Sequence, residues 1–308
     1  MSPSLCIITP SYSGDIEQFA LLRRSLQLFA PDIPHIAIVH TEDYFEFQDR
    51  FARDSNLEVF RTCDLLPSSV EARRRKSGPR WLTGKWLHGR RISGWVAQQI
   101  TKLYALAQCD YDAVAFIDSD VFLCRPIQAD YFFIDGRLKL FRRPARDAES
   151  LNFDIATHIV LGNPLHQVHQ LYDYIYSPAC FRKSTAVRLF EEFKRRKRST
   201  WARRFVSVRS PSEYNLLGYT ATVLEHQAGY HLLECEPEDL HHSIRFPEDR
   251  DRLEAEIAGM RTHRKDFVRI QSRLDIHPDR IASAFDKVVE LHKTLERTLP
   301  EHSYAVMT

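Results

Sequence analysis

Short apolar segments alternate with amphipathic ones through the first sixty residues. The run at 5–9 is nearly all apolar, as expected of a strand buried on both faces. A helix is predicted before Pro31, because apolar side chains recur every three or four residues at Ile16, Phe19, Leu22, Leu26 and Phe29. Further strands are predicted at 36–39 and 57–60. This alternation favours a parallel sheet covered by helices.

The rest of the chain continues in the same way. A helix capped near Ser93 leads into the wholly apolar strand at 113–117, and another strand is expected at 138–141. The segment 152–161 is interpreted as a strand region. Helices are predicted at 184–198, at 213–222 and from Pro278 onward. The predicted fold class is therefore α/β, with a mixed, mainly parallel sheet flanked by helices and a C-terminal helical segment.

Composition agrees with a folded globular protein. The 308 residues are 44% hydrophobic and 27% charged, which is enough apolar material for a full core. The six cysteines form no C-x-x-C pair, so we expect them to be reduced and do not expect a structural zinc site. Met1–Pro10 has no basic leader followed by a long apolar stretch, and we therefore expect a cytoplasmic protein.

Charge is strongly segregated although the net charge is only +2. Ala72–Gly94 carries eight Lys or Arg and no acid, and Arg182–Arg209 carries eleven against two glutamates. Such segments attract anions, while the alternative is a solvated helix face. We expect Arg73–Arg91 to cover a diphosphate or an acidic acceptor. We expect Arg195–Arg204 to face an anionic acceptor or the inner face of a membrane.

Two carboxylates follow the apolar strand at 113–117. Asp118 and Asp120 have one small residue between them, and ligands bind at the carboxyl ends of parallel strands. Carboxylate oxygens are the ligands preferred by Mg²⁺ and by similar hard cations, which can bridge the phosphates of a nucleotide. An isolated D-x-D also occurs by chance at the end of a strand, so the motif alone leaves both interpretations open.

Four motifs in a fixed order resemble a known superfamily. They are Thr9-Pro10-Ser11-Tyr12-Ser13-Gly14-Asp15, Gly94-Trp95-x-x-Gln98-Gln99-x-x-Lys102-Leu103, Ile117-Asp118-Ser119-Asp120 and Ser212-Glu213-Tyr214. Together they are similar to the nucleotide-diphospho-sugar-dependent glycosyltransferases of GT-A fold, and to bacterial proteins of that superfamily that often lie among polysaccharide genes. The resemblance covers about the first 240 residues.

The resemblance implies roles for matching residues. Thr9, Pro10, Ser11 and Tyr12 would line the base and ribose pocket. Asp118 would contact ribose or metal, and Asp120 would bind Mn²⁺ or Mg²⁺ and so support catalysis. Lys102 would approach the phosphates or hold the Asp118 loop, unless it is a surface lysine with a buried stem. His241 or His242 would complete the metal shell, the alternative being a loop histidine.

The acceptor side is less defined by the sequence. Glu213 either binds an acceptor hydroxyl and removes its proton, or stabilises a helix N-terminus. Asp154 and His158 are further candidates on this side. The implied organisation has a nucleotide-sugar half at 1–130, an acceptor half at 131–245 and a helical segment at 246–308.

Three functions remain as hypotheses. The first is a metal-dependent transfer of a sugar from a nucleotide-diphosphate donor to a saccharide acceptor, in bacterial surface polysaccharide or glycoconjugate synthesis. In one version of this hypothesis the acceptor is anionic or lipid-linked, and the protein makes peripheral contact with an acidic membrane. No nucleic acid is expected as a partner. The second is a non-enzymatic protein that binds anionic polymer or nucleic acid. The third, a sugar nucleotidyltransferase, normally needs a glycine-rich phosphate loop near the N-terminus, where only Gly14 is present.

Overall fold

In the computed structural model, the main sheet of the chain has the strand order β3-β2-β1-β4-β9. β1 (Leu5–Ser11) runs parallel to β2 (His35–Val39) on one side and to β4 (Ala113–Phe116) on the other. β3 (Leu57–Arg61) extends the parallel set, and β9 (Ala179–Arg182) adds one antiparallel edge. The predicted mixed, mainly parallel sheet is confirmed.

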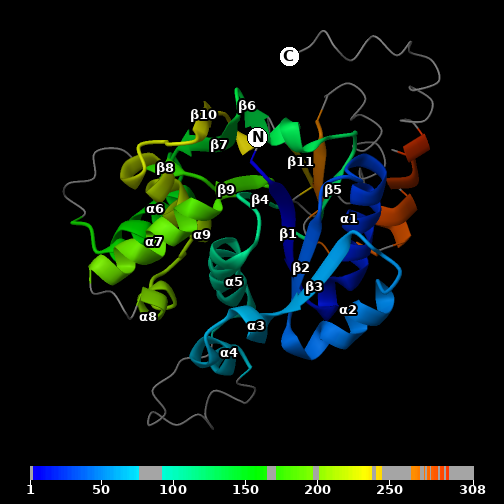
Figure 1. Ribbon diagram of the computed structural model, residues 1–308, viewed down its shortest axis with the longest axis horizontal. Helices are drawn as coiled ribbons and strands as arrows, with labels where there is room; N and C mark the ends of the chain where they lie inside the picture. The colour runs from blue at the N-terminus through cyan, green and yellow to red at the C-terminus, as the bar shows by residue number, and fades with distance from the viewer. Residues whose placement is uncertain are drawn as a thin grey trace. The chain divides into compact units, whose positions relative to one another are not determined.

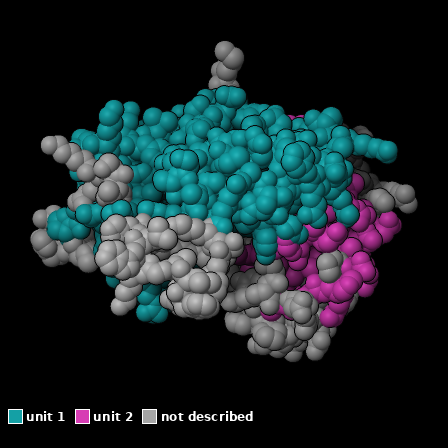
Figure 2. Space-filling view, turned by 90° about the horizontal axis from the view of Figure 1, so that it is seen from below, with its two compact units in different colours: residues 1–13, 33–118, 129–236 teal, residues 14–32, 119–128, 237–308 magenta. Residues whose placement is uncertain are grey.

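The structure describes residues 3–75, 92–164, 171–196, 201–237, 241–244 and 265–270, and most of 274–290. These residues form two compact units. Unit 1 contains 1–13, 33–118 and 129–236, and unit 2 contains 14–32, 119–128 and 237–308 (Figure 2). The predicted division at residues 130 and 245 was contiguous in sequence, whereas these units interleave. The functional halves assigned to that division stay a prediction.

Burial explains why β1 and β4 occupy the middle of the sheet. Every residue of both strands is buried, as their apolar sequences require. α5 (Gly94–Gln108) contacts both strands and lies alongside β1 in Figure 1. It begins where predicted, because the Ser93 hydroxyl accepts a hydrogen bond from the amide of Val96.

Short helices follow β2 and β3. The turn η2 (Thr41–Asp43) and α2 (Tyr44–Arg50) come after β2, and α3 (Thr62–Leu65) and α4 (Ser68–Arg74) come after β3. All four therefore start at the carboxyl edge of the parallel strands.

A second sheet of unit 1 has the order β10-β7-β6, with β8 also pairing with β7. Its strands are β6 (Phe133–Ile134), β7 (Arg137–Pro144), β8 (Tyr172–Asp173) and β10 (Tyr230–Glu234), and η3 (Ala129–Phe132) precedes β6. The expected strand at 138–141 is the centre of β7, and it is confirmed.

The segment predicted as a strand region at 152–161 is a helix, so that prediction is wrong. α6 (Ala148–Leu161) starts at Asp147, whose carboxylate accepts from the amide of Ser150, and ends at Gly162 in the left-handed conformation. Its buried face includes the polar side chains of Asp154, Thr157 and His158. Polar residues on the inner face hide the helical period of apolar ones, which is why the pattern misled.

The helices predicted at 184–198 and 213–222 are present, whereas the short helix at 201–205 was not predicted. α7 (Lys183–Arg195) is followed by α8 (Trp201–Phe205), and the Trp201 ring stacks on Phe193 at 5.0 Å. α9 (Glu213–Tyr219) is capped by the Ser212 hydroxyl and continues as a π-helical turn, η5 (Thr220–Leu224). The predicted end at residue 222 thus falls inside that turn.

Unit 2 has its own small sheet, in the order β11-β12-β5. β5 (Val121–Leu123) pairs antiparallel with β12 (Phe267–Ile270), which pairs parallel with β11 (His241–Ile244). α1 (Ile16–Phe29) packs on β5, and the Ser25 hydroxyl accepts from the amide of Leu123. The described residues of 279–290 are helical, as expected from Pro278 onward. None of the helices in the described part of the chain combines the length and apolarity needed to cross a bilayer.

Candidate active site

The switch point of the parallel sheet lies between β1 and β4. From β1 the chain builds β2 and β3 on one side, whereas β4 is added on the other. In open α/β sheets, ligands bind at the carboxyl ends of strands that flank such a point. In unit 1, these ends carry the last residues of β1, Thr9–Ser11, with Tyr12 directly after them, and Asp118 shortly after β4.

The end of β1 carries polar groups inside an apolar strand. The Thr9 hydroxyl donates to the carbonyl of Ile117 at 2.8 Å and lies 3.0 Å from Nε2 of His35. Ser11 is buried, and its hydroxyl has no hydrogen-bond partner among the described residues. Such a hydroxyl is costly unless another group meets it. Tyr12, the next residue, is 43% exposed. This segment therefore places an exposed ring, Tyr12, directly after a buried hydroxyl, Ser11.

Lys102 is the centre of the strongest polar cluster at the switch point. Its ammonium lies 2.9 Å from Oδ1 of Asp118, 2.7 Å from the hydroxyl of Tyr214 and 3.1 Å from Oε1 of Glu213. The side chains of Lys102 and Glu213 are each 4% exposed, whereas that of Asp118 is 22% exposed. An ammonium has three N–H donors, and three acceptors surround this one. Lys102 is thus buried and paired with Asp118, and its role toward the phosphates or the Asp118 loop stays a prediction.

The charges of this cluster depend on one another. Burial alone would lower the pKa of Lys102, but Asp118, Tyr214 and Glu213 together raise it well above its usual value, so the lysine is charged. Burial raises the pKa of Glu213, and Lys102 opposes that effect. Burial also raises the pKa of Tyr214 well above its usual value, so the phenol is neutral. Asp118 is the member of the cluster that a ligand can reach most easily.

Glu213 faces Lys102 rather than solvent. Its backbone amide donates a hydrogen bond to Oε1 of Gln99 at 3.3 Å. The same helix α5 therefore holds the N-terminus of α9 through Gln99 and Lys102. In this arrangement the Glu213 carboxylate is the counter-charge of a buried lysine.

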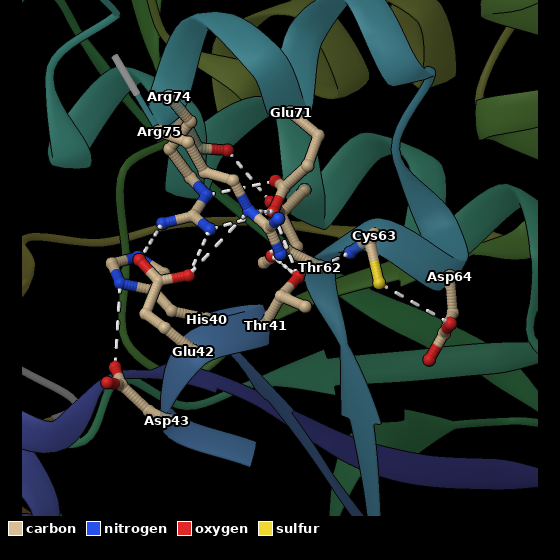
Figure 3. Close-up of polar contacts among 12 residues, drawn as sticks. His40, Thr41, Glu42, Asp43, Thr62, Cys63, Asp64, Glu71, Arg74 and Arg75 are labelled. Atoms are coloured by element: carbon tan, nitrogen blue, oxygen red, sulfur yellow. Dashed lines mark hydrogen bonds and ion pairs between the residues drawn. The ribbon is translucent and has the colours of Figure 1, made fainter. Parts of the chain in front are cut away.

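A second polar cluster lies after β2 and β3, and the sequence analysis did not identify it (Figure 3). Arg74 contacts both carboxylate oxygens of Glu42, at 2.8 and 2.7 Å, and both of Glu71. Glu71 also accepts from the hydroxyls of Thr41 and Thr62. The spacing of Glu71 and Arg74 on one helix signals their pairing. The sequence holds no signal for Glu42, which comes from another element.

This cluster changes the interpretation of the basic segment Arg73–Arg91. Arg74 is buried and Arg75 pairs with Glu71 at 2.9 Å, so these two arginines brace α4 and do not form a mobile cover. The rest of that segment, 76–91, lies outside the described residues.

The residues after β1 contact those after β2. The Tyr12 and His40 rings are 5.6 Å apart, and Asp43 accepts a hydrogen bond from the amide of Ser13. Burial lowers the pKa of His40.

Asp120 belongs to unit 2 and has a cationic neighbour there. Its Oδ2 lies 3.6 Å from Nε of Arg269, and its carbonyl accepts from the amide of Ile270. The hydroxyl of Ser119 donates to Asp15 at 3.2 Å. Arg269 was not singled out from the sequence, because an arginine within a short strand has no local signature.

The register of the small sheet locates the two histidines predicted as metal ligands. His241 and His242 pair with Phe267 and Val268 of β12, which in turn pair with Leu123 and Phe122 of β5. β12 thus separates them from β5, the strand that follows Asp120. Their side chains lie outside the described residues, and their role stays a prediction.

Asp154 and His158 form a separate buried pair on α6. Oδ2 of Asp154 lies 3.2 Å from Nε2 of His158, whose Nδ1 lies 3.1 Å from the amide nitrogen of Asn163. The His158 ring also packs against Tyr219 at 5.2 Å. Both side chains are buried and engaged within the protein, so this geometry offers nothing to an acceptor.

Part of the second basic segment is also held by internal ion pairs. Glu192 on α7 accepts from Arg195 at 2.6 Å and from Arg196, and Arg196 also donates to Asn163. Arg203 on α8 is exposed. Residues 197–200 lie outside the described part of the chain. The expectation that this segment faces an anionic acceptor or a membrane stays a prediction.

A family model matches residues 4–293, and its description is a family of unknown function, DUF6492. The chain belongs to the DUF6492 family. No curated protein matches this member of the family in sequence.

Among solved structures, the chain is similar to a galactosyltransferase, LgtC, in complex with donor and acceptor sugar analogues. The identity is 14% and the TM-score 0.48, over 98% of this chain and 99% of that one. It is also similar to the apo form of mouse xyloside xylosyltransferase 1, with 11% identity and a TM-score of 0.44, over 89% of this chain and all of that one. Both TM-scores are below 0.5, so the function proposed below depends on this chain's own residues.

Proposed function

We propose that this DUF6492 protein is a glycosyltransferase that moves a sugar from a nucleotide-diphosphate donor to a saccharide acceptor. The observation that carries the proposal is the pair of strand ends at the switch point. The end of β1 offers the Ser11 hydroxyl and the Tyr12 ring, and the adjacent end of β4 offers Asp118, fixed by a buried lysine. The ring face and the hydroxyl suit a nucleoside, and the carboxylate suits a ribose hydroxyl or a cation that carries the diphosphate.

In the proposed reaction, the bond between the anomeric carbon and the diphosphate oxygen breaks, and the nucleoside diphosphate leaves with the bonding electron pair. The acceptor oxygen bonds to that carbon, and its proton passes to the departing diphosphate. Thr9–Tyr12 bind the nucleoside, and Asp118 accepts hydrogen bonds from its ribose. Lys102 pairs with Asp118 and keeps its carboxylate oriented. Holding reactants in place in this way supplies a large share of the rate enhancement in group transfer.

We further propose a divalent cation, Mn²⁺ or Mg²⁺, held by Asp118 and Asp120. The chemistry of these metal ligands fits, because both residues are carboxylates and they lie two positions apart in the chain. Within the described ranges, no group of three or more His, Cys, Asp or Glu side chains gathers as a complete site. Mg²⁺ commonly uses one or two carboxylates together with substrate phosphates and water, so two protein ligands suffice. When bound, the cation offsets the charge of the departing nucleoside diphosphate.

For Glu213 we propose a positioning role in place of the acceptor base expected from the sequence. Its carboxylate is buried against Lys102, and removing a proton from an acceptor requires direct contact with that hydroxyl.

We also propose that the reaction belongs to bacterial surface polysaccharide or glycoconjugate synthesis, and that the acceptor is anionic or lipid-linked. The motif resemblance and the charge pattern support this setting.

The test is release of nucleoside diphosphate from a panel of nucleotide sugars by the full chain with Mn²⁺. We expect at least one donor to be hydrolysed or transferred, and Asp118→Asn and Asp120→Ala to slow the reaction at least about a hundredfold. Asp130→Ala, on the exposed turn η3, is the matched control. Full donor turnover by Asp120→Ala in excess chelator would contradict the metal assignment, and no turnover of any donor by the wild type would contradict the function.

A further inference from the structure

The strands β1 and β4 separate at the switch point, and side chains connect them there. Backbone pairing runs from Leu5 to Ile8, where the amide of Ile117 donates to the Ile8 carbonyl. Past this point the Thr9 hydroxyl donates to the Ile117 carbonyl at 2.8 Å. The connection has therefore changed from main chain to side chain by the end of β4.

α5 makes the next connection. Nε2 of Gln98, which is half-buried, donates to the carbonyl of Pro10 at 3.3 Å. Pro10 directly precedes Ser11, whose buried hydroxyl has no partner within the described chain. Gln98 thus fixes the backbone of the segment that presents Ser11 and Tyr12.

Three side chains of α5 hold three different segments. Gln98 holds the end of β1, Gln99 holds the start of α9, and Lys102 holds Asp118 together with Glu213 and Tyr214. The contacts of Gln98 are separate from those of Lys102. Loss of the Gln98 contact therefore affects the strand end without removing a charge from the buried cluster.

We propose that Gln98 is a positioning residue for the nucleoside part of the donor, which it serves by fixing the Pro10–Tyr12 backbone. This inference rests on the proposed function. It assigns Gln98 to nucleotide affinity, whereas the Lys102 cluster serves the orientation of Asp118. A backbone segment held in its bound conformation saves part of the ordering cost of binding.

The experiment measures the binding of UDP, GDP, CDP and ADP by calorimetry to the full chain, with Mg²⁺ present. Gln98→Met keeps the length of the side chain and removes the donor. For the nucleotide that the wild type binds most tightly, we expect its dissociation constant to rise about three- to tenfold, the effect of one lost hydrogen bond. The melting temperature without nucleotide is expected to stay near that of the wild type.

The matched control lies on the same helix. Nε2 of Gln108 donates to the carbonyl of Leu65 at 3.2 Å, a bond of the same kind away from β1. Gln108→Met is expected to bind the nucleotide as the wild type does. Amide hydrogen exchange adds a local readout, because Gln98→Met is expected to lose protection in a peptide covering 9–13, and Gln108→Met in one covering 62–66. If Gln98→Met is unstable, Gln98→Glu replaces it, since it keeps the shape and cannot donate.

The outcomes separate this inference from the proposed function. If the wild type binds a nucleotide and both methionine variants bind it as tightly as the wild type does, the proposed role of Gln98 is wrong and the proposed function stands. If the wild type binds none of the four nucleotides, the proposed function fails and the inference fails with it. With a donor sugar, the expected signature is a raised KM at unchanged kcat.

Discussion

A single buried ammonium organises the polar cluster at the end of β4. Lys102 has two carboxylates and one phenol around it, and the carboxylates come from two different segments of unit 1, the end of β4 and the start of α9. Charged groups that leave water need partners, and a buried pair that loses one partner is strongly destabilised. The cluster is therefore expected to matter for stability as well as for function.

Lys102→Met tests this dependence. The substitution leaves Asp118 and Glu213 without their counter-charge, and we expect the free energy of unfolding to fall by about 3–5 kcal/mol. Lys102→Met combined with Glu213→Gln removes one of the two unpaired carboxylate charges, and we expect it to recover part of the lost free energy of unfolding. Urea unfolding of both proteins gives the comparison. A single variant as stable as the double variant would contradict a buried, charged Lys102.

Glu213→Gln distinguishes positioning from acid–base chemistry. A general base typically contributes a factor of about 10²–10⁴ to the rate. Since the Glu213 carboxylate contacts Lys102, we expect kcat to fall less than about tenfold, with the shape of the pH–rate profile retained. The measurement is steady-state donor turnover between pH 5 and 9. Loss of the acidic limb of the profile, which a general base produces when it is protonated, would restore the proton-abstraction role.

At the scale of elements, α4 is joined to the turn after β2 by ion pairs rather than by apolar packing alone. Arg74 bridges Glu42 of η2 and Glu71 of α4 (Figure 3). The bond from Arg74 lowers the pKa of Glu42 to about 2. Burial would raise the pKa of Glu71, but bonds from Arg74 and Thr41 leave it lowered.

These lowered pKa values predict acid sensitivity. A carboxylate with a lowered pKa in the folded state stabilises the fold fully above its unfolded value near 4.5, and that contribution is lost as the pH falls toward about 2. We expect Glu42→Gln to lower the free energy of unfolding by about 0.5–1 kcal/mol at pH 7, since the pair is half-exposed. The difference from wild type should shrink between pH 4.5 and 2. Glu46→Gln on exposed α2 is the control, and a difference independent of pH would contradict the ion-pair account.

At the scale of the whole molecule, ligand binding is expected to raise stability. A ligand that binds only the folded state adds about 2.7 kcal/mol at a hundred times its dissociation constant. For a chain of this size we expect a nucleoside diphosphate with Mn²⁺ to raise the melting temperature by several degrees, about 2–4 °C per kcal/mol. The metal-dependent part of that shift should vanish in Asp120→Ala. Equal shifts with and without Mn²⁺ would argue against a metal-bridged diphosphate.

The parts of the fold that could be predicted are those with a local period. The strands β1, β2 and β4 are mostly short apolar runs, β3 mixes apolar and charged residues, and α1 and α5 repeat apolar residues every three or four positions. Strand ends also follow from these runs, so the positions of Thr9–Tyr12 and Asp118 could be predicted from the sequence. The helix α6 could not be predicted, because the polar residues Asp154 and His158 lie on its buried face.

The sequence by itself determined the alternation of strands and helices and the polar residues at the strand ends, because side-chain periodicity reports which face of an element is buried. Only the tertiary structure decided what those residues contact. Lys102 and Tyr214 are 112 positions apart, and Glu42 and Arg74 are 32 apart. Contacts at such separations depend on how elements pack, and no period within one element encodes them.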